Sequence, residues 1–188
     1  MKPGALLLFP GAGADRNQRT LVALDRALST RVPVERADFP YRKAGKKAPD
    51  REPVLLAAVR EEAAALVERA GIRAGRLVLG GRSMGGRMCS MAVADGLSAR
   101  GLVLISYPLH PPGRPDRPRT GHLPSITQPC LFVHGTKDPF GSPDELEAAT
   151  ATIPGDVTHA WIDGGRHDLG GADARIVTAV GDWLNSLR

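Results

Sequence analysis

The chain has 188 residues, of which 42% are hydrophobic and 24% charged. These values fit one globular domain, expected here over residues 1–188, and they exclude a collagen, a coiled coil and extended disorder. The formal net charge of +5 is compatible with anionic partners, but no zinc-finger spacing or RNA-binding aromatic motif accompanies it, so no nucleic-acid partner is expected.

The first half of the chain alternates short apolar runs with stretches of helical periodicity. The run Ala5–Phe9 is too short for a secretory signal or a spanning helix, which favours a cytoplasmic protein without a membrane partner. Asp50 and Gly71 suit the start and the end of a long helix. In chain order, the predicted elements are a strand Ala5–Phe9, a helix Asn17–Leu28, a strand Val32–Ala37, a helix Arg51–Ala70, a strand Arg76–Gly80 and a helix Met84–Ala94.

The second half continues this alternation around a proline-rich segment, Pro108–Pro129, which has no helical pattern and is too short for a lid domain. Uniformly apolar strands are buried on both faces of a sheet, and their alternation with helices requires parallel crossovers. We therefore predict a compact α/β fold of about six mostly parallel strands with helices on both faces and the functional site beyond the carboxyl ends of the strands. The remaining predicted elements are a strand Gly101–Ser106, a strand Cys130–His134, a helix Pro143–Thr152, a strand His159–Ile162 and a helix Ala172–Leu187.

The strongest chemical signal is the run Gly81-Arg82-Ser83-Met84-Gly85, which matches G-x-S-x-G between a predicted strand and a predicted helix. A sharp turn there lifts the serine hydroxyl clear of the sheet, and the glycines remove side chains that would clash. The N-terminus of the following helix favours developing negative charge. The motif predicts that Ser83 is a nucleophile; the alternative is a glycine-rich turn with an incidental serine.

A serine nucleophile needs a base, and the chain offers five histidines. His167 lies between the last strand and the closing helix, at the expected functional edge of the sheet. His159 begins the last strand and belongs at the opposite edge, while His134 ends a strand and is expected to pack or cap. His110 and His122 lie in the proline-rich segment, from which they could reach the site. We predict that His167 is the base.

An acid must orient the imidazole and stabilise its charged form. Asp138 follows the fifth strand, and the chain order Ser83, Asp138, His167 is the one expected for α/β-hydrolases. Asp163 is the rival, although it lies close to His167 in sequence. Asp168 adjoins the histidine and is expected to cap the final helix.

An oxyanion hole requires two backbone N–H donors. We assign one to Met84, the residue after the nucleophile, and the other to Ala12 in the loop after the first strand, with its neighbour Gly13 as the alternative. That loop does not match the dinucleotide-binding motif G-x-G-x-x-G, because Arg16 occupies the position of the third glycine. Neither a phosphate-binding loop nor a zinc motif is present, so no cofactor and no metal are expected.

The chain resembles the small bacterial α/β-hydrolases related to dienelactone hydrolase, and more closely the group that includes the hydrolase-like domain of the non-specific lethal chromatin complex. The resemblance implies the same serine, acid, histidine and oxyanion loop. Dienelactone hydrolase proper uses a cysteine nucleophile, from which Ser83 departs. The segments that carry the resemblance are Phe9–Gly13, Ala37–Tyr41, Gly80–Arg87, Tyr107–Gly113, His134–Phe140 and Asp163–His167.

These observations favour a serine hydrolase that cleaves a small soluble ester or thioester through an acyl-enzyme. The alternatives are a non-catalytic interaction module on the same fold and a peptidase. Tyr41 and His110 both follow predicted strands, so we expect them to line the wall of an open site; the alternative is that they hold their own loops in place.

Overall fold

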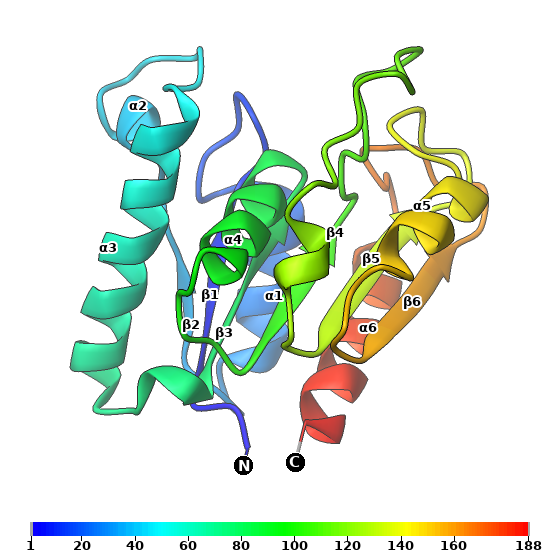
Figure 1. Cartoon of the computed structure of the whole chain (residues 1–188). Coiled ribbons are helices and arrows are strands. Elements are labelled where there is room, and N and C mark those ends of the chain that lie inside the picture. Colours follow the sequence, from blue (N-terminus) through cyan, green and yellow to red (C-terminus); the bar gives the residue numbers. More distant parts are fainter. Residues whose placement is uncertain (1, 188) are drawn as a thin grey trace.

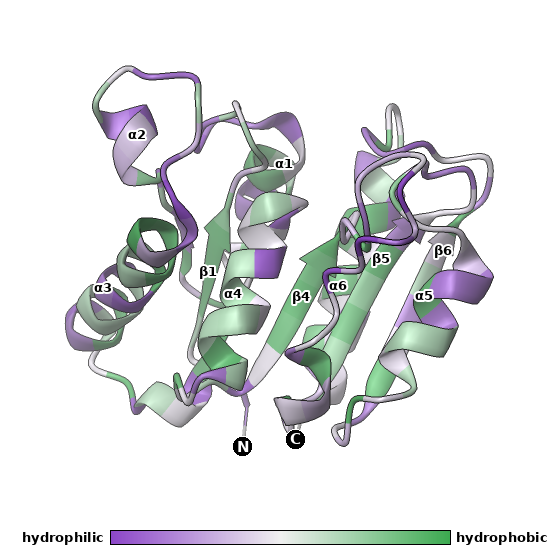
Figure 2. Cartoon of the chain, turned by 45° about the horizontal axis from the view of Figure 1, so that its top comes forward, coloured by the Kyte–Doolittle hydropathy of each residue, from purple (hydrophilic) through white to green (hydrophobic). Residues whose placement is uncertain are grey.

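The computed structural model describes residues 2–187, which form one six-stranded sheet. The strand order is β2-β1-β3-β4-β5-β6, and all five neighbouring pairs are parallel, so the predicted α/β-hydrolase architecture is confirmed. Figure 2 shows β1 and most of β4 and β5 in the colour of hydrophobic residues, as expected of strands that are buried on both faces. The strands are β1 (Ala5–Phe9), β2 (Val34–Arg36), β3 (Leu77–Arg82), β4 (Gly101–Ile105), β5 (Cys130–Gly135) and β6 (Val157–Ile162).

Helices cover both faces of this sheet (Figure 1). Apolar side chains of α1 and α6 belong to the cluster on one face, whereas those of α3, α4 and α5 belong to the cluster on the other. The helices are α1 (Arg19–Leu28), α2 (Pro40–Lys43), α3 (Glu52–Ala70), α4 (Met84–Ala94), α5 (Pro143–Thr150) and α6 (Asp173–Ser186).

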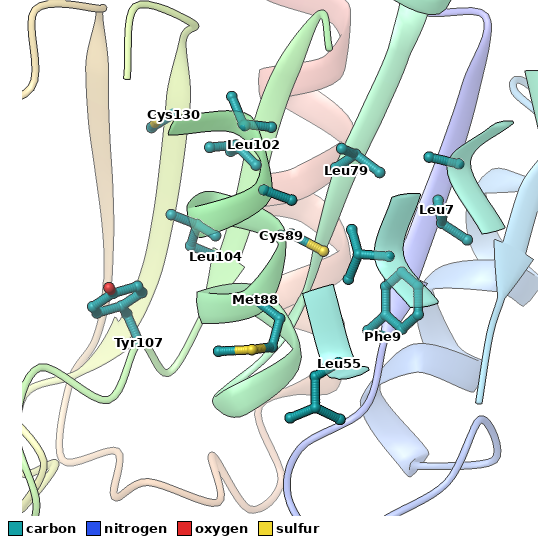
Figure 3. Packing of buried hydrophobic residues seen from close by; sticks show 14 of the residues in the cluster. Leu7, Phe9, Leu55, Leu79, Met88, Cys89, Leu102, Leu104, Tyr107 and Cys130 are labelled. Atoms are coloured by element: carbon teal, nitrogen blue, oxygen red, sulfur yellow. The ribbon is translucent and has the colours of Figure 1, made fainter. Parts of the chain in front are cut away.

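Alternate residues of each strand supply the two clusters. Leu79 of β3 packs on the α3–α4 side, whereas its neighbour Val78 packs on the α1–α6 side. Met88 and Cys89 of α4 face the strands in Figure 3. Burial raises the pKa of the Cys89 thiol and raises that of Cys130 to about 12, so both cysteines are inert apolar groups of the core.

Several boundaries differ from those predicted. Asp50 does not cap α3: the N-cap position is Arg51, and Pro53 lies in the first turn, where its missing N–H costs nothing. Gly71 ends that helix with φ at 60°, as predicted. The one-turn helix α2 escaped prediction because four residues carry no periodicity.

The parallel arrangement brings the loops that follow β1, β3, β5 and β6 to one edge of the sheet. These are the loops on which the sequence places the oxyanion donor, the serine, the acid and the histidine. Within residues 2–187, no helix is long and apolar enough to cross a lipid bilayer.

Candidate active site

Ser83 lies on a strained turn between β3 and α4. Its φ of 50° and ψ of −116° are a conformation that non-glycine residues rarely adopt. The strand continues two residues past the predicted end because Gly81 and Arg82 still pair with β4. Position 85 requires a glycine because the backbone of β1 approaches it closely. A Cβ at this position would lie 2.4 Å from the carbonyl oxygen of Phe9.

The side chain of Ser83 makes no capping bond to α4, although the residue occupies the N-cap position. Its Oγ lies instead 2.9 Å from Nε2 of His167. Nδ1 of the same ring lies 2.8 Å from Oδ2 and 3.0 Å from Oδ1 of Asp138. An ionised carboxylate can only accept a hydrogen bond, so Nδ1 carries the ring proton and the Nε2 lone pair faces the serine hydroxyl. The structure thus brings together the three side chains that the sequence selects.

Burial and a backbone hydrogen bond hold the Asp138 carboxylate in place. It is 5% exposed, and its Oδ1 accepts a hydrogen bond of 2.9 Å from the N–H of Phe140. The Phe140 ring stacks on His167 with centroids 4.0 Å apart. His134 is fully buried; its Nε2 donates to the carbonyl of Gly141 at 2.9 Å and lies 3.6 Å from Asp138. His134 therefore packs, as expected, and also closes the turn that carries the acid.

The rival acids are engaged elsewhere. Asp163 accepts a hydrogen bond from the hydroxyl of Thr136 at 3.3 Å. Asp168 accepts one from the N–H of Gly170 at 3.4 Å, and the N-cap residue of α6 is Ala172. The expectation that Asp168 caps the final helix is therefore wrong.

The other candidate histidines, His159 and His122, form hydrogen bonds with other residues. His159 lies 3.0 Å from the Thr150 hydroxyl, and His122 lies 2.8 Å from Oγ of Ser90. Burial, with the nearby Arg87, lowers the pKa of His122 to about 4. Each of these rings has its own local partner on the α3–α4 side of the sheet.

Two backbone N–H groups remain free beside Ser83. Met84 is the first residue of α4, and Ala12 lies in the loop after β1; both line the same cavity as the serine. Within residues 2–187 neither N–H has a hydrogen-bond acceptor, whereas the N–H of Gly13 donates to the Tyr41 hydroxyl at 3.1 Å. The geometry therefore favours Ala12 over Gly13 as the second oxyanion donor.

The cavity in front of Ser83 has a volume of about 500 Å³. Its floor includes the serine, His167 and the two free N–H groups. Apolar side chains share its walls with four charged ones, of which Arg87 and Glu52 form an ion pair of 2.9 Å. Nine further residues of the cavity wall were not predicted from the sequence. They are Pro49, Asp50, Glu52, Leu55, Arg87, Met88, Pro108, Arg119 and Phe140.

Tyr41 and His110 are not among the residues that line this cavity. The Tyr41 ring is 1% exposed, and its hydroxyl accepts the Gly13 N–H; burial raises its pKa. His110 is 7% exposed, with Nδ1 2.8 Å from the carbonyl oxygen of Pro111 and Nε2 3.5 Å from Glu145. The expected wall role does not fit this geometry, and both side chains hold loops, which was the alternative.

Comparisons with known proteins agree with this fold. The family model described as an alpha/beta hydrolase domain matches residues 2–182. Est1E from Butyrivibrio proteoclasticus is similar in structure, with a TM-score of 0.76 and 16% identity over 99% of this chain and 88% of its own. A dienelactone hydrolase from Anabaena variabilis gives a TM-score of 0.77 and 17% identity over 97% and 86% of the two chains. A putative hydrolase of the α/β superfamily from Xanthomonas campestris gives a TM-score of 0.73 and 21% identity over 97% of this chain and 99% of its own.

Proposed function

The chain belongs to the alpha/beta hydrolase domain family, and we propose that it is a serine hydrolase that cleaves a small ester or thioester. The observation that carries the proposal is the continuous hydrogen-bonded series from Ser83 through His167 to Asp138, beside two unoccupied N–H donors. The narrower grouping with the hydrolase-like domain of the non-specific lethal complex is part of the proposal and rests on the sequence segments quoted above.

In the proposed reaction, Oγ of Ser83 attacks the substrate carbonyl while Nε2 of His167 accepts the hydroxyl proton. Asp138 stabilises the imidazolium through Nδ1. The N–H groups of Ala12 and Met84 receive the oxyanion of the tetrahedral intermediate. His167 then returns its proton to the departing alcohol or thiol, and a water attacks the acyl-enzyme by the same route.

The cavity supports a small substrate. Its volume of about 500 Å³ is within the usual range for small-molecule sites. Leu55, Met84 and Met88 offer apolar surface to an acyl chain, and the 108–129 segment adds Pro108 and Arg119 to the wall without forming a lid domain.

A panel of p-nitrophenyl esters from acetate to octanoate, with a matched acetyl thioester, tests the proposal. The wild-type protein should hydrolyse the shorter esters, and Ser83→Ala and His167→Gln should each remove turnover while the fold survives. Wild-type protein without turnover would favour the interaction module instead, and activity retained in Ser83→Ala would contradict a serine mechanism.

A further inference from the structure

One charged side chain next to the nucleophile is buried and has no part in the proposed proton transfer. Arg82 is the last residue of β3 and is 7% exposed. Side chains alternate along a strand, so Arg82 shares the face of Val78, on the α1–α6 side of the sheet. The side chain of Arg82 therefore leaves the strand on the face opposite the α3–α4 cluster.

In the part of the chain that the structure describes, the guanidinium of Arg82 has one hydrogen-bond acceptor. Its Nη2 donates to the backbone carbonyl of His167. Its Nε is buried and, within residues 2–187, has no partner. Burial lowers the pKa of Arg82, opposed by Asp168 and Asp138, yet an arginine stays protonated. Burial of a cation costs stability, and such local costs are found at functional positions.

The loop that carries His167 lacks regular structure of its own. It spans the residues between β6 and α6, and Gly164, Leu169 and Gly171 adopt positive φ within it. Among the described residues, the imidazole is hydrogen-bonded to Asp138 and Ser83 alone. The backbone of the same residue is fixed by the bond from Arg82, the immediate neighbour of Ser83 in sequence.

We propose that Arg82 is a positioning residue that ties the backbone of His167 to the strand end carrying Ser83. The effect of this contact on catalysis rests on the proposed function. Because Arg82 and Ser83 are adjacent, any movement of the end of β3 carries the base along with the nucleophile. The Nε2–Oγ distance of 2.9 Å is thereby kept within hydrogen-bonding range.

Arg19 supplies a matched control. Its guanidinium reaches the carbonyl of Leu169 in the same loop at 3.5 Å, and it pairs with Asp173 at 2.9 Å. Its side chain is 58% exposed, and within residues 2–187 its hydrogen bond and ion pair go to Leu169 and Asp173 rather than to Ser83 or His167. Loss of Arg19 should therefore loosen the start of α6 without changing the geometry of the base.

The test compares Arg82→Met, Arg82→Lys and Arg19→Met in ester hydrolysis. Arg82→Met should lower kcat by roughly 10- to 100-fold, the scale of a 1 Å misplacement, with KM within about twofold of wild type because the cavity wall is intact. Arg82→Lys should recover part of the loss, since its ammonium can still donate to the carbonyl. Arg19→Met should stay within about twofold of wild type in both constants.

A second readout needs no turnover. The Nδ1 proton of His167 shared with Asp138 should give a far-downfield proton resonance, assigned by its loss in His167→Gln. It should persist in Arg19→Met and broaden or vanish in Arg82→Met at a temperature where circular dichroism shows the fold intact. Should Arg82→Met fail to fold, Arg82→Lys decides: its kcat should lie below that of wild type and its resonance should be broader, because an ammonium lacks the rigid planar fork of the guanidinium. Wild-type kcat and an unchanged resonance in the folded Arg82 variant would overturn the proposal, whereas absence of turnover in wild type would count only against the hydrolase assignment.

Discussion

Nδ1 of His167 lies 2.8 Å from Oδ2 of Asp138, although 29 residues separate the two in sequence. The contact exists because β5 and β6 are parallel neighbours, so the loops after them meet at one edge. The carboxylate is held in turn by the Phe140 N–H. The Asp138 carboxylate is therefore held in place, and its bond to Nδ1 turns Nε2 of His167 toward Ser83.

This contact predicts which acid matters. Asp138→Asn should lower kcat by about 10⁴-fold, because an amide no longer selects the productive tautomer of His167. Asp163→Asn is the matched control and should stay within about twofold of wild type, since Asp163 bonds Thr136 instead. Steady-state hydrolysis of one short ester measures both. A larger loss in the Asp163 variant would show that the wrong acid has been chosen.

Tyr41 should affect the oxyanion loop rather than substrate selection. Tyr41→Phe keeps the ring packing but leaves the Gly13 N–H without its acceptor, a loss of about 1–2 kcal/mol. We expect kcat/KM to fall by a similar factor for short and long acyl esters, with a lower Tm. A loss confined to one acyl length would instead support a role in the cavity wall.

Gly85 should be irreplaceable. In Gly85→Ala the new Cβ would lie 2.4 Å from the Phe9 oxygen and 2.5 Å from the Pro10 oxygen. The β1 loop that carries Ala12 must then shift, which should cost about 1–3 kcal/mol of stability and slow hydrolysis. Gly75→Ala is the control, because the nearest atom to its Cβ would lie 4.0 Å away. Equal unfolding free energies for the two variants in urea would contradict this reading of the turn.

His122 should make stability depend on pH. Its pKa is lowered to about 4 by burial and by Arg87, below the roughly 6.5 of an unfolded chain. The unfolded state therefore binds the proton first, so the contribution of His122 to the free energy of unfolding should be constant above about pH 6.5 and fall as the pH drops toward 4.

Urea titrations at pH 7 and pH 4.5 measure this loss. His122→Gln should reduce it, because the amide can still donate to Ser90 but does not titrate in this range. The loss should not vanish, since burial also lowers the pKa of His134 and His159. An identical loss in wild type and His122→Gln would contradict the assignment.

The fold was predictable because its signals are local and strong. Short, uniformly apolar runs such as Gly101–Ile105 are typical of strands buried on both faces, and α4 begins and ends where its pattern does. Strand ends were less predictable. Arg82 looks like the start of a loop by its charge, yet its backbone pairs with Ile105 and its side chain reaches the His167 loop.

The sequence predicted correctly only those site residues that lie in loops at the carboxyl ends of strands. This placement selects Ser83, Asp138 and His167, but it does not tell where a loop side chain points. Tyr41 follows a strand and turns inward to Gly13, whereas Arg119 lies far along the proline-rich segment and enters the cavity. Arg87 could have been found, because it lies one helical turn after Ser83 on the same face of α4.

The most direct test of the account is labelling with a fluorophosphonate, followed by peptide mass spectrometry to locate the adduct. Ser90 is the informative rival, since it too bonds a histidine but is fully buried. If Ser83 is the nucleophile, an adduct forms on Ser83 in the wild-type protein and in Ser90→Ala, and none forms in folded Ser83→Ala. An adduct on another serine, or no adduct on the folded wild-type protein, would contradict it.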